Sequence, residues 1–358
     1  MSANNKIITV AVIGMGLMGP RHADAVVKEP NTKLVALVDP APQTQDLATK
    51  YGVSYFATIG ELLASQQKPE AAVICTPNHV HAVCAEELAA AGVHILVEKP
   101  LCTDAQTGKD LVVHLKEIAA RTGVKSLVGH HRRFNPFSLA TREATTSGSL
   151  GHITAVNGLW TVFKPAPYFE AGQWRKTKTG GPILINLIHD VDLLHYFLGP
   201  IVRVQTEKTV SRRGFEAEEG AAIIFKFGSG TIGTFLLCDN VVSPFGWEFG
   251  TGESPWFPHT GQDFYRFFGT DASLSVPDMT RWSYTGTKSW MEKITGEKIP
   301  VGTGEPIENQ LAHFVRVIRG EEQPRCTLDA GLAALIVCEA VKESLERGTA
   351  VDIEPYEL

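Results

Sequence analysis

The feature that most constrains the fold is a set of spaced glycines near the start of the chain, Gly14, Gly16 and Gly19. They follow a continuous apolar run, residues 7–13, and precede a segment with helical character, residues 20–28. A strand buried on both faces is typically such a run. Glycines between a strand and a helix allow a tight turn, the approach of a phosphate, and close packing of the helix on the strand. The pattern predicts a phosphate-binding turn at the first strand of a doubly wound sheet.

The rest of the first third of the chain alternates predicted strands and helices with short loops. Further strands are expected at residues 34–38, 71–75, 94–97 and 126–128. Two capping boxes, Thr58 with Glu61 and Thr103 with Gln106, are expected to begin helices. This alternation predicts a parallel Rossmann sheet with right-handed crossovers over residues 1–129, in the α/β class.

The pattern changes beyond residue 129, and residues 130–358 are expected to form a second α/β domain. Its predicted strands span 152–162, 201–210, 221–227 and 231–238, of which the last two form a hairpin in an antiparallel sheet with one exposed face. Helices are predicted at 183–198, 308–319 and 328–347, and the last of them is expected to pack back on the first domain. The Pro-, Gly- and Trp-rich stretch 243–262 is expected to be a long ordered loop, and its part from Trp247 to His259 is expected to cover a site.

Bulk composition excludes several classes of protein. The length, 358 residues, predicts two domains. The net charge of -6 gives no attraction for nucleic acid or for an anionic membrane. Six scattered cysteines predict reduced thiols and a cytoplasmic protein, and the short polar N-terminus, residues 1–6, predicts neither a signal peptide nor a membrane span.

Polar residues follow the predicted parallel strands at the ends that face a ligand crevice. Asp39 ends the second strand, where a carboxylate accepts from ribose hydroxyls and repels a 2′-phosphate, so NAD is expected rather than NADP. The pair His79 and His81 lacks a clear third ligand, so no metal is expected. Lys99 lies at the end of a central strand, where a solvated surface lysine is unexpected. The predicted cofactor contacts are Gly14, Gly16, Leu17, Met18, Gly19, Asp39, Thr76, Pro77, Asn78, His81, Glu98 and Lys99.

A second polar cluster is expected on the helix that follows Gly180 and Gly181. At helical spacing Asn186, His189 and Asp190 share one face, which suits a polyhydroxylated substrate or a metal. Polar neighbours argue against an ordinary buried histidine at this position.

The chain resembles the glucose–fructose oxidoreductase, inositol dehydrogenase and rhizopine catabolism (MocA) family over nearly its whole length. The resemblance rests on the glycine turn, on Thr76-Pro77-Asn78, Glu98-Lys99-Pro100 and residues 132–136, on the segment from Gly180 to Asp192, and on the ending 328–351. It implies that Lys99 and His189 are the catalytic lysine and histidine. It also implies a bound NAD or NADP, a sugar or cyclic polyol substrate, and a large, mostly antiparallel sheet that forms the oligomer interface.

One departure from the family pattern concerns the helix that carries His189. Family dehydrogenases commonly have an aspartate four residues before the histidine, and Ile185 occupies that position. Asn186, the next residue, can take part of that role, but an amide cannot accept a proton. The substrate is therefore hard to infer.

Together these observations predict an NAD-dependent dehydrogenase acting on a CH–OH group of a sugar, polyol or sugar acid. His189 would take the hydroxyl proton, and Lys99 would stabilise the developing alkoxide. The expected substrate contacts are Lys99, Arg132, Trp160, Trp174, Asn186 and His189. Two alternatives remain open, a nucleotide-sensing regulator and glycoside cleavage through transient oxidation with recycled NAD. A homodimer or homotetramer is expected, without nucleic-acid or membrane partners.

Overall fold

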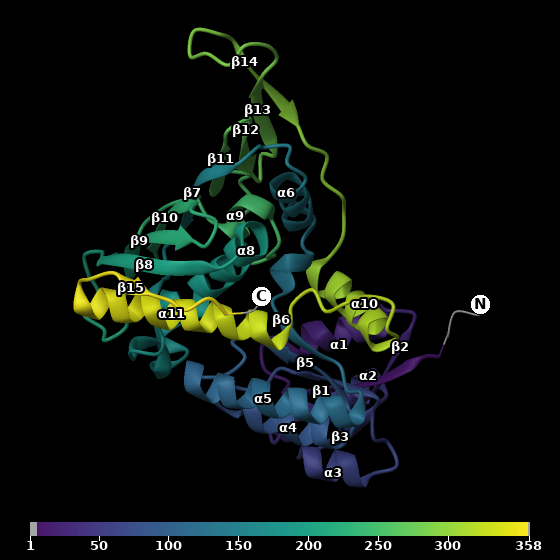
Figure 1. Ribbon diagram of the computed structural model, residues 1–358. Coiled ribbons are helices and arrows are strands. Elements are labelled where there is room, and N and C mark those ends of the chain that lie inside the picture. Colours follow the sequence, from purple (N-terminus) through teal and green to yellow (C-terminus); the bar gives the residue numbers. More distant parts are fainter. Residues whose placement is uncertain (1–5, 357–358) are drawn as a thin grey trace. The chain divides into compact units, whose positions relative to one another are not determined.

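The computed structural model of the chain describes residues 6–356, so residues 1–5 of the predicted polar N-terminus lie outside it (Figure 1). The chain forms two compact units. Unit 1 comprises Met1–Phe134 and Gly304–Leu332, and unit 2 comprises Asn135–Thr303 and Ala333–Leu358.

Unit 1 is built on a six-stranded parallel sheet in the order β3-β2-β1-β4-β5-β6. Its strands are β1 (Ile8–Ile13), β2 (Thr32–Val38), β3 (Ser54–Phe56), β4 (Ala71–Ile74), β5 (His94–Glu98) and β6 (Ser126–Gly129). The doubly wound sheet predicted from the sequence is confirmed. The chain winds outward from β1 to β3 and then returns to β4, so the strand order reverses between β1 and β4. Ligands bind such sheets at this point, outside the carboxyl ends of the strands.

Helices cover both faces of this sheet. They are α1 (Gly19–Lys28), α2 (Thr44–Tyr51), α3 (Ile59–Ala64), α4 (His81–Ala90), α5 (Ala105–Thr122) and α10 (Pro306–Ile318), with the short turns η1 (Asn78–Val80) and η2 (His131–Phe134). Figure 1 shows α1 and α10 together on one face and α4 and α5 on the other. Leu311 and Phe314 of α10 join the same buried cluster as Val12 and Val26. A helix near the end of the sequence therefore completes the packing around the first strand.

The sequence predicted the capping residues of two helices, and the structure confirms one and contradicts the other. The hydroxyl of Thr58 accepts from the Glu61 N–H at 3.2 Å, as predicted for α3. For α5, the N-cap is Asp104 and not Thr103, since Asp104 Oδ1 accepts from the Thr107 N–H at 2.8 Å. A carboxylate is favoured here because it also meets the positive end of the helix dipole. Hydrogen bonds from Thr107 lower the pKa of Asp104.

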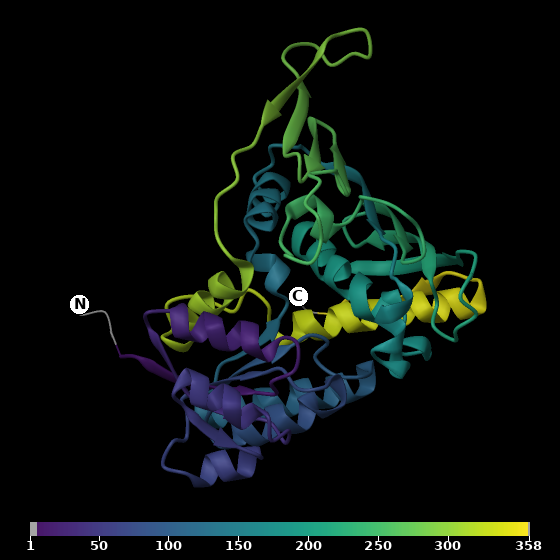
Figure 2. The ribbon, with the colours of Figure 1, turned by 180° about the vertical axis from the view of Figure 1, so that it is seen from behind.

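Unit 2 contains a nine-stranded sheet in the order β14-β13-β12-β11-β7-β10-β9-β8-β15. The strands are β7 (Ile153–Thr161), β8 (Ile201–Lys208), β9 (Gly220–Phe227), β10 (Ile232–Cys238), β11 (Tyr265–Gly269), β12 (Ala272–Val276), β13 (Thr280–Tyr284), β14 (Ile294–Lys298) and β15 (Val351–Asp352). All its described pairings are antiparallel except that of β7 with β10. The predicted hairpin is β9 and β10. Figure 2 shows β13 and β14 at one end of the sheet, joined by a projecting loop.

The helices of unit 2 pack on one face of its sheet. They are α6 (Pro136–Thr146), α7 (Ala166–Glu170), α8 (Ile188–Leu198), α9 (Trp247–Thr251) and α11 (Leu328–Arg347), which begins within unit 1, with the turns η3 (Gln173–Lys176) and η4 (Ile183–Leu187). The predicted helix 183–198 opens as a π turn, η4, before α8. The predicted loop 243–262 contains α9, because Trp247 is buried and packs against Phe264 with ring centroids 5.3 Å apart.

Within residues 6–356, no helix is both long and apolar enough to cross a membrane.

The Asp104 cap generates a stability prediction. Asp104→Ala should lower the free energy of unfolding by about 1 kcal/mol, because the α5 N–H groups lose their acceptor. Thermal unfolding of each single variant against the unmodified protein measures this loss, expected to be about 1–2 °C in Tm for a chain of 358 residues. Thr103→Ala is the matched control and should cost less. Equal losses in both variants would contradict the assignment of the cap.

Candidate functional site

The glycine turn of unit 1 is shaped to admit a phosphate. Gly14 has φ of +88°, and a Cβ on it would lie 2.7 Å from the Thr76 nitrogen. A Cβ on Gly19 would lie 2.2 Å from the Gly14 carbonyl oxygen, so neither position accepts a side chain. Gly16 instead faces open space, with no heavy atom of the described residues within 4 Å of its Cβ position beyond its chain neighbours. No described side chain caps α1 at Met18, so the first N–H groups of the helix are left for a ligand.

Asp39 lies at the end of β2 and is fixed beside this turn. Its Oδ2 accepts from the Met15 N–H at 2.6 Å, and its Oδ1 accepts from the Ala41 N–H at 2.8 Å. Each carboxylate oxygen retains acceptor capacity after one such bond. The carboxylate is thus held in one orientation next to the glycine turn.

The loop after β4 is tied to the loop after β5 by His81. Its ring nitrogens lie 2.8 Å from the carbonyl oxygens of Thr76 and Pro100. Burial lowers the pKa of His81, and the two carbonyl bonds oppose that effect. His81 therefore joins the loops that follow β4 and β5, and its predicted contact with a cofactor stays a prediction. Thr76 is partly buried, whereas Pro77 and Asn78 are exposed at the same edge.

Glu98, the residue before Lys99, is buried and hydrogen-bonded to His22. Its Oε1 lies 2.7 Å from Nε2 of His22, the first turn of α1, and its Oε2 accepts from the Lys99 backbone N–H at 3.1 Å. Burial alone would raise the pKa of Glu98, but the hydrogen bond from His22 and the charges of His22, His131 and Lys99 outweigh it and lower the pKa to about 2. The folded pKa thus lies below the unfolded one. The pair stabilises the fold above the ordinary carboxyl pKa, and this stability is lost as the pH falls toward 2.

His22 is a functional candidate that the sequence reasoning missed. It follows Gly19 by three residues and is 1% exposed, while its partner lies far along the chain. The sequence did offer one sign of its role, because His22 is a polar residue on the face of the helix that packs against the sheet. Arg132, a predicted substrate contact, lies in η2 and is also buried.

In unit 2, His189 lies in the first turn of α8 and is 7% exposed. Its neighbour Asp190 is fully buried and accepts from the Tyr265 hydroxyl. Asn186, in the π turn before α8, is partly exposed, and its Oδ1 accepts from Lys164 Nζ at 2.8 Å. Asp190 is therefore engaged in the interior of unit 2, and Asn186 and His189 remain as the polar pair predicted on this helix.

Lys164 belongs to a buried charged cluster that the sequence reasoning did not identify. Its Nζ lies 3.2 Å from Oδ2 of Asp239, whose Oδ1 lies 2.5 Å from Nη1 of Arg213. It also lies over the rings of Trp160 and Tyr168, at 5.4 and 5.0 Å from the centroids. Burial lowers the pKa of Lys164, and the charge of Asp239 opposes this shift.

The tryptophans expected near a substrate differ in exposure. Trp160 is 1% exposed, and its indole N–H donates to Glu248 Oε2 at 2.9 Å. Trp174 is 52% exposed. Trp247, at the start of the expected cover, is a core residue. Of these three tryptophans, Trp174 is therefore the one that a ligand can reach from solvent.

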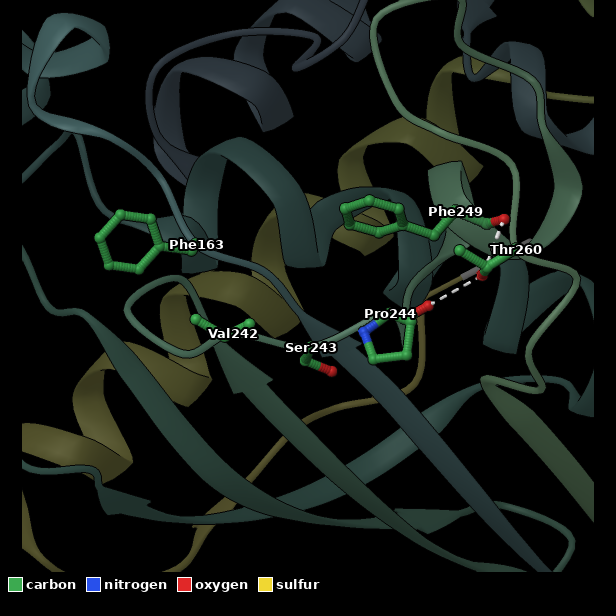
Figure 3. A pocket seen from close by; sticks show the side chains of 6 residues that line it. All are labelled: Phe163, Val242, Ser243, Pro244, Phe249 and Thr260. Carbon is green, nitrogen blue, oxygen red and sulfur yellow. Dashed lines mark hydrogen bonds between the residues drawn. The ribbon is translucent and has the colours of Figure 1, made fainter.

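An apolar hollow of about 410 Å³ lies in unit 2 close in sequence to Lys164 and Asp239 (Figure 3). It is lined by Phe163, Val242, Ser243, Pro244, Phe249 and Thr260. Phe163, which lines the hollow, precedes Lys164 in the sequence. It pairs in an isolated β-bridge with Asn240, the residue after Asp239.

Comparison with known proteins identifies both parts of the chain. A sequence profile described as an oxidoreductase family with an NAD-binding Rossmann fold matches residues 8–130. A second, described as the C-terminal alpha/beta domain of that oxidoreductase family, matches residues 142–353. The chain belongs to the glucose–fructose oxidoreductase, inositol dehydrogenase and MocA family. The predicted resemblance is confirmed, and the chain is an oxidoreductase with an NAD-binding domain.

Several known proteins are similar to this chain over much of its length. The 1,5-anhydro-D-fructose reductase of Ensifer adhaerens is 25% identical over 310 residues, which cover 86% of each protein. The inositol 2-dehydrogenase of Rhizobium meliloti (strain 1021) is 32% identical over 193 residues, 54% of this chain and 55% of that protein. The structure of the WlbA dehydrogenase from Bordetella pertussis, in complex with NADH and UDP-GlcNAcA, has a TM-score of 0.76 at 23% identity and covers 98% of this chain and 99% of that one. This structural likeness shows the shared fold.

The position of Asp39 generates a prediction about cofactor preference. The protein should bind NAD at least about tenfold more tightly than NADP, because a 2′-phosphate would meet a fixed carboxylate. Asp39→Ser should narrow that gap, as measured by titration of both dinucleotides. Asp46→Ser, at an exposed position of α2, is the control and should leave the ratio unchanged. Equal affinity of the unmodified protein for NADP would contradict the prediction.

Proposed function

We propose that the protein is an NAD-dependent dehydrogenase that acts on a CH–OH group of a sugar, cyclic polyol or sugar acid. The observation that carries the proposal is the position of Lys99 just after β5. Its backbone N–H donates to Glu98, and Glu98 also contacts His22 of α1, the helix that follows the glycine turn. Relatives named as an anhydrofructose reductase and an inositol dehydrogenase support the substrate class.

We assign different roles to the two parts of the chain. Residues 1–129 would bind the dinucleotide through Gly14, Gly16, Leu17, Met18, Gly19, Asp39, Thr76, Pro77, Asn78, His81, Glu98 and Lys99. Residues 130–358 would bind substrate and form the oligomer interface, with the C-terminal helix packing back on the first domain. NAD, when bound, supplies the hydride acceptor. The N–H groups of α1 would hold its pyrophosphate, and Asp39 its ribose.

Two side chains would act on the substrate oxygen. His189 would accept the hydroxyl proton, since a neutral imidazole is the commonest general base in enzymes. The Lys99 ammonium would donate a hydrogen bond to that oxygen and stabilise its developing negative charge. Arg132, Trp160, Trp174 and Asn186 are the further proposed substrate contacts, and the burial of Trp160 makes it the weakest of them.

The chemistry is tested by replacing either group. Lys99→Ala and His189→Ala should each lower kcat by about 10²–10⁴-fold, the usual effect of losing acid–base catalysis, with a much smaller change in NAD affinity. The kcat of the unmodified protein should rise with pH through an ionisation that His189→Ala removes. Steady-state rates on a substrate selected from sugars, inositols and sugar acids provide the measurement. Full turnover by His189→Ala would show that another residue is the base.

We also propose that the protein works in the cytoplasm as a homodimer or homotetramer. The six cysteines form no disulfide within the described chain. The sheet face of unit 2 opposite its helices exposes the side chains of Ile224, Ile232, Leu236 and Phe268. The register places Ile232 and Phe268 on either side of Ala155, so these apolar groups lie on neighbouring strands. Lys226 and Arg266 lie on the same face, so the apolar groups form a patch beside charged residues. A patch of this kind is typical of a subunit interface.

The interface is tested by charge insertion. Ile232→Lys should weaken or abolish the oligomer, because it places an ammonium group in an apolar contact. Light scattering at micromolar concentration gives the mass. Val113→Lys, at an exposed position of α5, is the control and should leave the mass unchanged. A monomeric mass for the unmodified protein would refute the proposed assembly.

A further inference from the structure

We infer that Lys164 is a positioning residue that turns the Asn186 amide into a hydrogen-bond donor toward the substrate, and that this selects substrates carrying a carboxylate. The inference rests on the proposed function for the position of the substrate near His189. It adds a specificity-determining pair, Lys164 and Asn186, within unit 2.

The first step is that Lys164 is held in place. It is 8% exposed, its Nζ contacts Asp239 at 3.2 Å, and Arg213 fixes the other oxygen of that carboxylate. Arg213 also donates to the backbone carbonyl oxygen of Asp239. The ammonium is therefore confined by an ion pair with a fixed carboxylate and by two aromatic rings, and it has little freedom to leave its partner.

The second step is the orientation of Asn186. An ammonium group has donors only, so the atom of the amide that lies 2.8 Å from Lys164 Nζ must be the oxygen. The amide nitrogen then lies on the opposite branch of the planar group. No described residue accepts a hydrogen bond from it, and the Asn186 side chain is partly exposed. The two N–H bonds of Asn186 are therefore available to a ligand.

The third step concerns the group that such a ligand presents. Asn186 precedes His189 by three residues, so its donors lie one turn from the proposed base. A carboxylate at this position, as in family members with an aspartate near it, would repel a substrate carboxylate. An amide donor attracts one, and a hydrogen bond to a charged acceptor is stronger than one to a neutral hydroxyl. The geometry favours a sugar acid over a neutral polyol.

A stability cycle tests the positioning without any substrate. In the NAD-saturated full chain, Asn186→Asp should change the Tm by less than about 2 °C, because Lys164 pairs with the new carboxylate. In a Lys164→Met background, the same substitution should lower the Tm by at least about 4 °C more, because the new carboxylate and Asp239 then lose the ammonium group that contacts both positions. Equal shifts in both backgrounds would overturn the coupling. Lys164→Gln, which keeps a neutral donor, replaces Lys164→Met if that variant does not fold.

A binding comparison tests the selectivity. The probes are two matched pairs, D-gluconate with D-glucitol and D-glucuronate with D-glucose, titrated calorimetrically into the NADH-loaded protein. At least one acid should bind about tenfold or more tightly than its neutral partner, and Asn186→Asp should reduce that advantage by at least about tenfold. Lys164→Met should also reduce it. Lys293→Met, at an exposed position, is the matched control and should leave the ratio unchanged.

The possible outcomes separate this inference from the proposed function. Binding is measured at equilibrium, so an acid preference that depends on Asn186 supports the inference even if no hydride transfer occurs. Equal binding of acid and neutral probes, binding of neither acid, or an acid preference that survives Asn186→Asp would overturn it. Such results would leave the roles proposed for Lys99 and His189 standing.

Discussion

The buried pair of Glu98 and His22 is the interaction on which the nucleotide-binding unit depends. Glu98 ends a central strand and His22 lies in the first turn of the helix that follows the glycine turn, so one hydrogen bond joins the two loops expected to meet the cofactor. Removing either partner would break a buried hydrogen-bonded pair, which costs several kcal/mol in proteins. The same carboxylate accepts from the Lys99 N–H, so the position of the proposed catalytic lysine depends on the pair.

Unit 2 also contains buried polar groups that are paired with one another, but the residues are different. Asp190 is fully buried and bonded to Tyr265, and Lys164 is held between Asp239 and Asn186. These contacts connect the helix that carries His189 to the sheet and to the segment after β7. In each unit, the backbone that carries the candidate catalytic residue is thus anchored by a residue close to it in the chain, Glu98 for Lys99 and Asn186 or Asp190 for His189.

Local patterns in the sequence predicted much of this architecture. The glycine turn, the parallel strands and the β9–β10 hairpin follow from periodicity and turn residues, which depend on neighbours in the chain. The cap of α5 was misplaced by one residue, because Thr103 and Asp104 both suit an N-cap and only the geometry distinguishes them. The helix α9 was missed because its formation depends on the burial of Trp247 and not on a periodic pattern.

Contacts between residues far apart in the chain could not be predicted from the sequence. His22 and Glu98 are 76 residues apart, and Lys164 and Asn186 are 22 apart, so no local spacing signals either pair. The helix 308–319 was predicted from its pattern, but its packing against α1 depends on the tertiary fold. The departure at Ile185 was visible in the sequence. Only the structure shows that Lys164 donates a hydrogen bond to Asn186, the residue after Ile185.

The central claim, hydride transfer from a carbinol carbon to NAD, is tested most directly by following that hydrogen. Sugars, inositols and sugar acids deuterated at their carbinol carbons would be incubated with NAD and the protein, and the reduced cofactor would be analysed by mass spectrometry. The account predicts that at least one compound yields accumulating NADH that carries the deuterium, and that Lys99→Ala abolishes it. Failure of every compound to yield labelled NADH, under conditions where NAD binding is demonstrated, would contradict the claim.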